Sequence, residues 1–308
     1  MLLIPSILLA TSALATSGGA IPSEAVAAKA CTVPQGWSEI ATRHPRYVVF
    51  GELHGTQESP AFLGNLACGL ASRGERILVA IELQSAADDA LQQAWKLPDD
   101  RFVQAASAAG FAHREDGVAS QAMFAMLVRL HGLKEAGLPI DVVAFNGTAD
   151  QARRFPELAA QGPHEAAQAE NIREAASRGT YDNVLVLVGN FHAGKVRHGD
   201  GAESFDPMAV RLASFGSVVS LNMRYATGTA WNCLVKPGMK LVPGHPLPDD
   251  ALDCGNHSVQ SSVDLQRAPF IQLGAFPGAK ADSAPLYDGF FWLGPISGSA
   301  PFSPTKKP

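Results

Sequence analysis

The chain has few charged residues and few long hydrophobic runs. The apolar stretch at the N-terminus is too short for a membrane-spanning helix, and no other segment reaches the roughly 18 uninterrupted apolar residues that such a helix needs. Charged residues make up 17% of the chain, and the net charge of −5 is spread without long runs of one sign. These absences argue against a membrane span and against nucleic acid or anionic lipid as partners. A small molecule or a peptide is the expected substrate, and the oligomeric state is left open.

Several familiar catalytic and metal-binding motifs are also missing. The chain has no G-x-S-x-G elbow, which disfavours a serine hydrolase of the α/β type, and no H-E-x-x-H helix, which would indicate a zinc protease. Its four cysteines contain no C-x-x-C pair, so in an exported protein they predict two disulfides rather than a zinc site. Cys233 and Cys254 are the expected pair, because both lie in a late region rich in glycine and proline. Four reduced thiols are the alternative.

Residues 1–30 have the composition of a secretory signal peptide and leader. An apolar run over residues 1–10 is followed by the small-residue site Ala13-Leu14-Ala15, although the usual basic residues before the run are absent. We therefore expect a periplasmic or secreted protein, with a flexible apolar tail as the alternative. Small residues also precede Cys31, so a lipoprotein anchored through this cysteine is a further interpretation.

Beyond the leader, the pattern predicts one α/β domain over residues 31–294. With 308 residues, 46% of them hydrophobic, the chain can bury a sizeable core. Apolar strands alternating with helices indicate an open, mostly parallel central sheet with helices on both faces. The sequence also predicts a small irregular C-terminal extension and a flexible tail over residues 295–308. The strands are expected at Tyr47–Glu52, Arg76–Glu82, Ile140–Phe145, Asn183–Val188 and Ser217–Leu221, with added strands at Trp231–Val235 and Asp288–Leu293.

Polar side chains gather at the ends of these strands. Glu52 and His54 follow the first strand, Glu82 ends the second, and His192 follows the fourth. The pattern Gly-x-x-His occurs twice, at Gly51 and at Gly189, each time directly after an apolar strand. Because ligands bind outside the carboxyl ends of the strands in such sheets, we expect one site at this edge.

Two imidazoles and two carboxylates at one edge are compatible with two kinds of chemistry. In the first, a carboxylate orients a histidine that takes a proton from water, while a second histidine steadies the developing oxyanion. In the second, Glu52, His54 and His192 bind a divalent metal that activates the water. The sequence leaves both open. His164 is the one further histidine that we regard as a candidate.

The segments Gly51–Glu58 and Val188–His192 resemble the superfamily that joins the erythromycin esterases, the ChaN-like haem-binding lipoproteins and the Tiki/TraB proteins. The resemblance covers Tyr47 to Met223 and is closest to the ChaN-like branch, to which the stretch Ala166–Ile172 is also similar. It maps the motif residues of the superfamily onto Glu52 with His54, Glu82 and His192.

The branches imply different functions. The esterase branch implies water activation by His54 and Glu52 without a metal, and the Tiki branch implies metal-dependent peptide cleavage. The ChaN-like branch implies haem binding at the cell envelope, for which tyrosine ligands would have to come from Tyr47, Tyr181, Tyr225 or Tyr287. Our leading hypothesis is an exported hydrolase of an ester or amide that uses Glu52, His54, Glu82 and His192. The alternative is an envelope protein that binds haem or a metal ion without turnover.

Overall fold

The structure is a computed structural model, and it describes residues 31–111, 116–239, 251–261, 263–278 and 285–302. The predicted signal peptide and the last six residues of the predicted tail lie outside these ranges. No helix in the described part of the chain is both long and apolar enough to cross a membrane.

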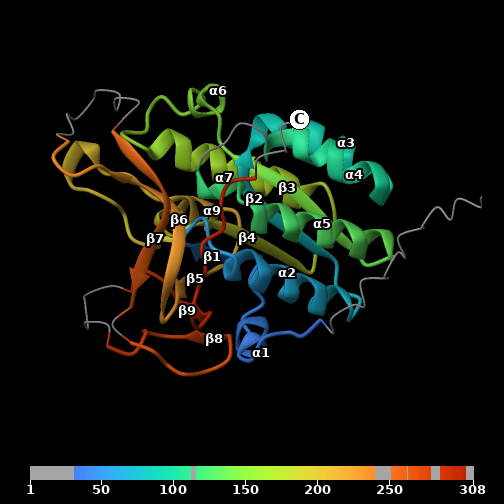
Figure 1. The fold of residues 1–308 in the computed structure, drawn as a ribbon. Helices are drawn as coiled ribbons and strands as arrows, with labels where there is room; N and C mark the ends of the chain where they lie inside the picture. Colours follow the sequence, from blue (N-terminus) through green and yellow to red (C-terminus); the bar gives the residue numbers. More distant parts are fainter. Residues whose placement is uncertain (1–30, 112–115, 240–250, 262, 279–284, 303–308) are drawn as a thin grey trace, which may run out of the picture. The chain divides into compact units, whose positions relative to one another are not determined.

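A seven-stranded sheet forms the centre of the described chain (Figure 1). All neighbouring pairs in it are parallel except β8 with β9, which confirms the predicted, mostly parallel sheet. The five predicted strands of the main run are all present within a few residues of their expected bounds. In spatial order, the strands are β3 (Ile140–Asn146), β2 (Ile77–Gln84), β4 (Asn183–Gly189), β1 (Tyr47–Glu52), β5 (Val218–Arg224), β9 (Gly289–Trp292) and β8 (Phe270–Leu273).

Helices cover both faces of the sheet, because alternate side chains of each strand point to opposite sides. On β1, Val48 and Phe50 face one core cluster, whereas Tyr47 and Val49 face the other. The first cluster packs under α1 (Trp37–Ala41), α2 (Glu58–Ala71), α3 (Asp88–Trp95), α4 (Asp99–Ala106) and α5 (Gln121–Glu135). The second packs under α7 (Gly162–Ser177), α8 (Asn190–Ala193) and α9 (Met208–Leu212); the short α6 (Ala149–Ala152) precedes α7. Burial on both sides explains why the strands are apolar through most of their length.

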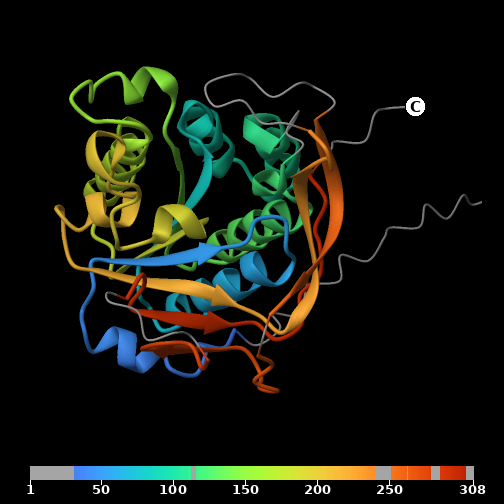
Figure 2. The same ribbon diagram turned by 90° about the vertical axis from the view of Figure 1, so that its left-hand side faces the viewer.

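The small C-terminal extension contains the added strands that the sequence predicts. The segment Asp288–Leu293 supplies β9, which joins the central sheet beside β5. The segment Trp231–Val235 lies in β6 (Thr227–Val235), which pairs instead with β7 (Leu252–Gln260) in a separate antiparallel ribbon. Figure 2 shows this ribbon standing across the end to which the β1 and β5 arrows point.

Residues 296–302, in the first half of the predicted tail, contact the rest of the described chain. Ser299 donates its backbone N–H to Gly55 at 2.8 Å, and Gly298 forms an isolated bridge with Thr56. Phe302 stacks on Phe124 at a ring-centroid distance of 4.0 Å. These contacts fasten the segment to α5 and to the loop that follows β1, which carries site residues.

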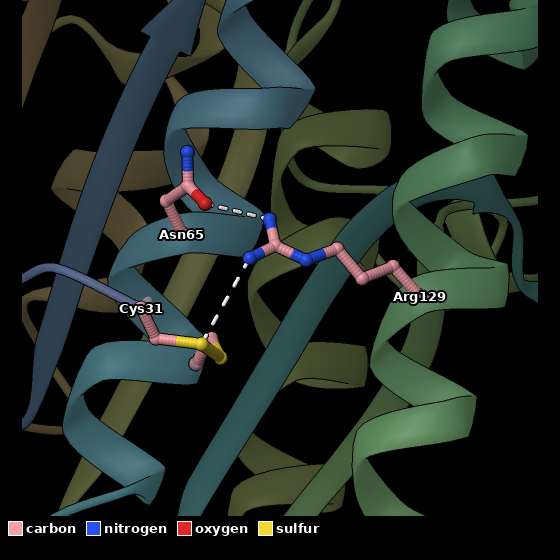
Figure 3. The surroundings of a disulfide bond; sticks show 4 residues. Cys31, Asn65 and Arg129 are labelled. Atoms are coloured by element: carbon pink, nitrogen blue, oxygen red, sulfur yellow. Dashed lines mark hydrogen bonds between the residues drawn. A yellow bond between two sulfur atoms is a disulfide. The ribbon is translucent and has the colours of Figure 1, made fainter. Parts of the chain in front are cut away.

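Two disulfides are present, as predicted for an exported chain. Cys233 and Cys254 pair across the ribbon and confirm the expected bridge. The second bridge joins Cys31 to Cys68 in α2, with the Arg129 side chain from α5 directed at Asn65 and the Cys31 sulfur (Figure 3). Because the Cys31 sulfur is bonded to Cys68, it has no thiol to carry a lipid anchor.

Candidate active site at the carboxyl edge of the sheet

The candidate site lies where the chain connections of two neighbouring strands diverge. Strand β1 leads through α2 on one face of the sheet to β2, whereas the adjacent β4 leads through α8 and α9 on the other face to β5. Divergent connections open a crevice at the carboxyl ends of the two strands, the common ligand site of open α/β sheets. His54 follows β1 and His192 follows β4, so the two histidines come from the two sides of this crevice.

The glycine of each Gly-x-x-His segment makes room for the other segment. A Cβ atom at Gly189 would lie 2.7 Å from Nε2 of His54, so any side chain there would displace that imidazole. A Cβ at Gly51 would lie 2.7 Å from Cβ of Ala193, in the short helix that carries His192. The two segments therefore fit against each other only because both glycines lack a side chain.

The structure brings together all four predicted residues and adds a fifth. Glu52, His54, Glu82, His192 and Glu165 form a row in which carboxylates and imidazoles alternate, called the carboxylate–imidazole row below. Oε1 of Glu52 lies 2.9 Å from Nδ1 of His54, and Oε2 of Glu82 lies 3.2 Å from Nε2 of the same ring. Oε1 of Glu82 lies 3.7 Å from Nε2 of His192, whose Nδ1 lies 2.7 Å from Oε1 of Glu165.

Glu165 is the residue that sequence reasoning missed. It lies in the first turn of α7, its side chain is fully buried, and its second oxygen accepts the backbone N–H of Met208 at 2.7 Å. An acidic residue in a first helical turn is common for electrostatic reasons alone, so the sequence carried no specific signal. Its neighbour His164, the further candidate, has its ring centroid 5.9 Å from that of His192 and accepts a hydrogen bond from Gln168.

The carboxylates raise the pKa of both histidines of the row. Burial alone would lower the pKa of His54, but the charge of Glu82 and the hydrogen bonds to Glu52 and Glu82 outweigh it, and the pKa is well above 6.5. Burial would also lower the pKa of His192. The hydrogen bond to Glu165 and the charges of Glu82 and Glu165 outweigh this effect and raise the pKa. Burial would raise the pKa of Glu82, yet its imidazole partners and the Gly189 N–H lower it to about 2.

The two histidines differ in how many of their ring nitrogens are hydrogen-bonded. Both ring nitrogens of His54 face carboxylate oxygens, so this imidazole is doubly protonated and has no lone pair for a substrate. His192 has only Nδ1 in a hydrogen bond within the described residues, and its side chain is 19% exposed. Glu52 also keeps one buried carboxylate oxygen, Oε2, without a hydrogen-bond partner there, a group that a bound molecule would satisfy.

The predicted metal ligands do not fit a metal ion in this arrangement. His54 belongs to the predicted ligand set, but its two ring nitrogens contact the carboxylates of Glu52 and Glu82, so neither nitrogen is available to a metal ion. Within the described ranges, no group of three or more His, Cys, Asp or Glu side chains has the geometry of a metal site.

Three of the four candidate tyrosines offer poor ligands for haem iron, which requires a phenolate, and the fourth, Tyr225, directly follows β5. Tyr47 is buried at the start of β1, away from the site edge. Burial and the nearby Asp141 carboxylate raise the pKa of Tyr181 to about 12. Tyr287 donates its hydroxyl proton to the carbonyl oxygen of Asn190 at 2.8 Å, and burial raises its pKa.

The pKa shifts of His54 and Glu82 predict how stability depends on pH. The raised pKa of His54 stabilises the fold below pH 6.5, and this contribution is lost as the pH rises through the folded-state value. The lowered pKa of Glu82 stabilises the fold above pH 4.5, and this contribution is lost as the pH falls toward 2. The contribution of the pair to the free energy of unfolding should therefore be largest between pH 4.5 and 6.5.

Urea unfolding between about pH 3 and pH 9 measures this dependence. A Glu82→Gln variant, which cannot hold the second proton on His54 by charge, should lose less stability than the wild type above pH 6.5. Parallel pH curves for the two proteins would contradict the assignment.

Several solved structures resemble this fold. No family model matches the sequence, and no curated protein matches it either. A succinoglycan biosynthesis protein shares 10% identity with a TM-score of 0.53, over 87% of this chain and 92% of that one. An erythromycin esterase shares 11% identity (TM-score 0.46; 71% of this chain, 78% of that one). ChaN of Campylobacter jejuni, solved with cofacial haem, shares 14% identity (TM-score 0.37; 60% of this chain, 84% of that one).

The chain shares its overall fold with the succinoglycan biosynthesis protein, and an erythromycin esterase and a ChaN protein are among its more distant structural neighbours. Two of the three branches that the motifs suggested are thus among its structural neighbours. At 10–14% identity the likeness shows the fold alone, so the activity has to be argued from the residues of the site itself.

Proposed function

We propose that the protein hydrolyses an ester or an amide, with His192 as the general base that takes a proton from water. The observation that carries the proposal is the asymmetry of the His192 ring: Nδ1 is fixed by the buried Glu165, while Nε2 has no hydrogen-bond partner among the described residues. A buried carboxylate on one nitrogen orients the ring and places the lone pair on the other, as in hydrolases that use a His–Asp pair.

The rest of the row supports the proton transfer. When His192 becomes an imidazolium, its Nε2 lies 3.7 Å from Oε1 of Glu82, so carboxylates flank the new charge on both sides. Glu82 stays ionised because of its low pKa, and it is held in place by His54 and by the backbone N–H of Gly189. In this proposal His54 positions Glu82, rather than activating water with Glu52 as the superfamily resemblance implied.

A screen of purified protein against neutral ester and amide libraries tests the proposal. The His54→Ala variant serves as the control for contaminating hydrolases. Without the His54 ring, Glu82 loses the contact that positions it beside His192. Turnover in the wild type that falls in the variant supports the proposal. No turnover with any ester or amide, together with a stoichiometric Soret band after haem addition, would favour the haem-binding alternative.

We also propose that the protein works outside the cytoplasm. The support is the pair of disulfides, since such bonds persist in oxidising compartments and are rare in the cytosol. Cell fractionation with thiol trapping tests this. Protein found in the cytosol with four reduced cysteines would contradict it.

A further inference from the structure

An exposed phenylalanine lies directly beside the proposed base. The ring of Phe191 is 44% exposed, and it meets the His192 imidazole edge to face at a centroid distance of 5.5 Å and an interplanar angle of 90°. Both residues belong to α8, the single helical turn that follows β4. The position of this ring relative to the base is therefore fixed by the same backbone.

The loop that follows α8 holds the Phe191 ring in place. His198 stacks on it with a centroid distance of 4.1 Å and an interplanar angle of 7°, and His198 also bonds the Phe191 carbonyl oxygen through Nε2 at 3.3 Å. His198 in turn exchanges two backbone hydrogen bonds with Phe205, whose ring packs 5.9 Å from that of Phe191. These three residues, Phe191, His198 and Phe205, are called the aromatic shelf below.

An ion pair closes the loop that carries the shelf. Arg197 contacts both carboxylate oxygens of Asp206, at 2.9 and 3.0 Å. An exposed apolar ring that is stacked and anchored in this way has little freedom left to lose when a ligand packs on it, which favours binding.

We propose that the aromatic shelf is the substrate subsite, and that it selects esters or amides with an aromatic ring next to the scissile carbonyl. Aromatic rings pair at centroid distances of about 4.5–7 Å, so a ring packed on Phe191 places a carbonyl one or two bonds away near His192. This inference rests on the proposed function, since it names the substrate class of the same site.

The charge of the site further restricts the substrate. Three carboxylates of the row stand against at most two imidazolium charges, and Glu82 and Glu165 flank His192 directly. A substrate with its own carboxylate near the reacting bond would meet repulsion from both. The substrate class is therefore a neutral or cationic aromatic ester or amide.

Two matched substrate pairs test the subsite: the first keeps the methanol leaving group and changes the acyl group, and the second keeps the acetyl group and changes the alcohol. The ratio of kcat/KM for methyl phenylacetate over methyl butyrate, and for benzyl acetate over butyl acetate, should exceed about tenfold. Phe191→Ala should reduce that ratio about tenfold, mostly through KM, and Phe191→Tyr should restore it. Phe215→Ala, which removes a 38% exposed phenylalanine outside the shelf, should leave the ratio unchanged.

The outcomes separate this inference from the proposed function. Turnover of alkyl and aromatic esters at equal efficiency, unaffected by Phe191→Ala, overturns the subsite and leaves the hydrolase standing. If neither an ester nor an amide turns over, the proposed function fails, and a binding measurement with benzyl alcohol then tests the aromatic shelf by itself. NMR shifts at His192 and His198 that disappear in Phe191→Ala support an aromatic subsite, and the absence of such shifts overturns it.

Discussion

Replacing His192 with asparagine should reduce kcat/KM for the best ester or amide substrate by about 10³-fold, the effect expected when a general base is removed. The asparagine amide can still donate to Glu165 in the place of Nδ1, so the buried carboxylate keeps a partner. What the variant lacks is the Nε2 lone pair that accepts the proton from water. The rate constants should be measured by steady-state kinetics on protein whose folding is checked by circular dichroism.

His164→Asn is the matched control for that experiment. His164 is a neighbouring histidine of the same edge, but its Nε2 is engaged by Gln168 and burial lowers its pKa. We expect its replacement to change kcat/KM by less than about threefold. A His192→Asn enzyme that keeps activity within the same limit would show that another group activates the water.

Much of the fold could be predicted because the strands are buried on both faces. A strand such as β4 must be apolar through most of its length, and the polar residues that end such strands then fall on one edge of the sheet. Glu52, His54, Glu82 and His192 were found in this way, since each lies within three residues of a strand end.

The missing parts come from contacts that no local pattern records. Glu165 reaches His192 from a helix that begins 30 residues earlier, at Gly162, and its first-turn position has an ordinary local explanation. Residues 296–302 have the composition of a loose tail, and only the chain that they meet, at Gly55 and Phe124, fixes them. Sequence patterns report what a segment needs to bury, and they are silent on which distant segment meets it.

The role of Glu165 gives the second large prediction, because the structure fixes how its amide analogue would sit. In Glu165→Gln, the oxygen must face the Met208 N–H that the second carboxylate oxygen now accepts, so the amide nitrogen must face His192. An N–H that donates to Nδ1 moves the proton of the neutral imidazole to Nε2. The lone pair that accepts the proton from water is then lost, and kcat/KM should fall by about 10³-fold with little change in fold.

The pH profile of Glu165→Gln separates this role from a merely structural one. Glu165 raises the pKa of His192 by its hydrogen bond and its charge, so the uncharged amide should lower that pKa. Because the base must be unprotonated, the acid limb of kcat/KM should move to lower pH while the plateau falls. Glu170→Gln, which alters a carboxylate of the same helix that pairs with Arg173, should move neither. A reduced plateau with an unmoved acid limb would mean that Glu165 only supports the packing between α7 and α9. A shifted acid limb, together with an Nε2–H signal in the ¹⁵N spectrum of His192, would establish Glu165 as the group that sets the tautomer of the base.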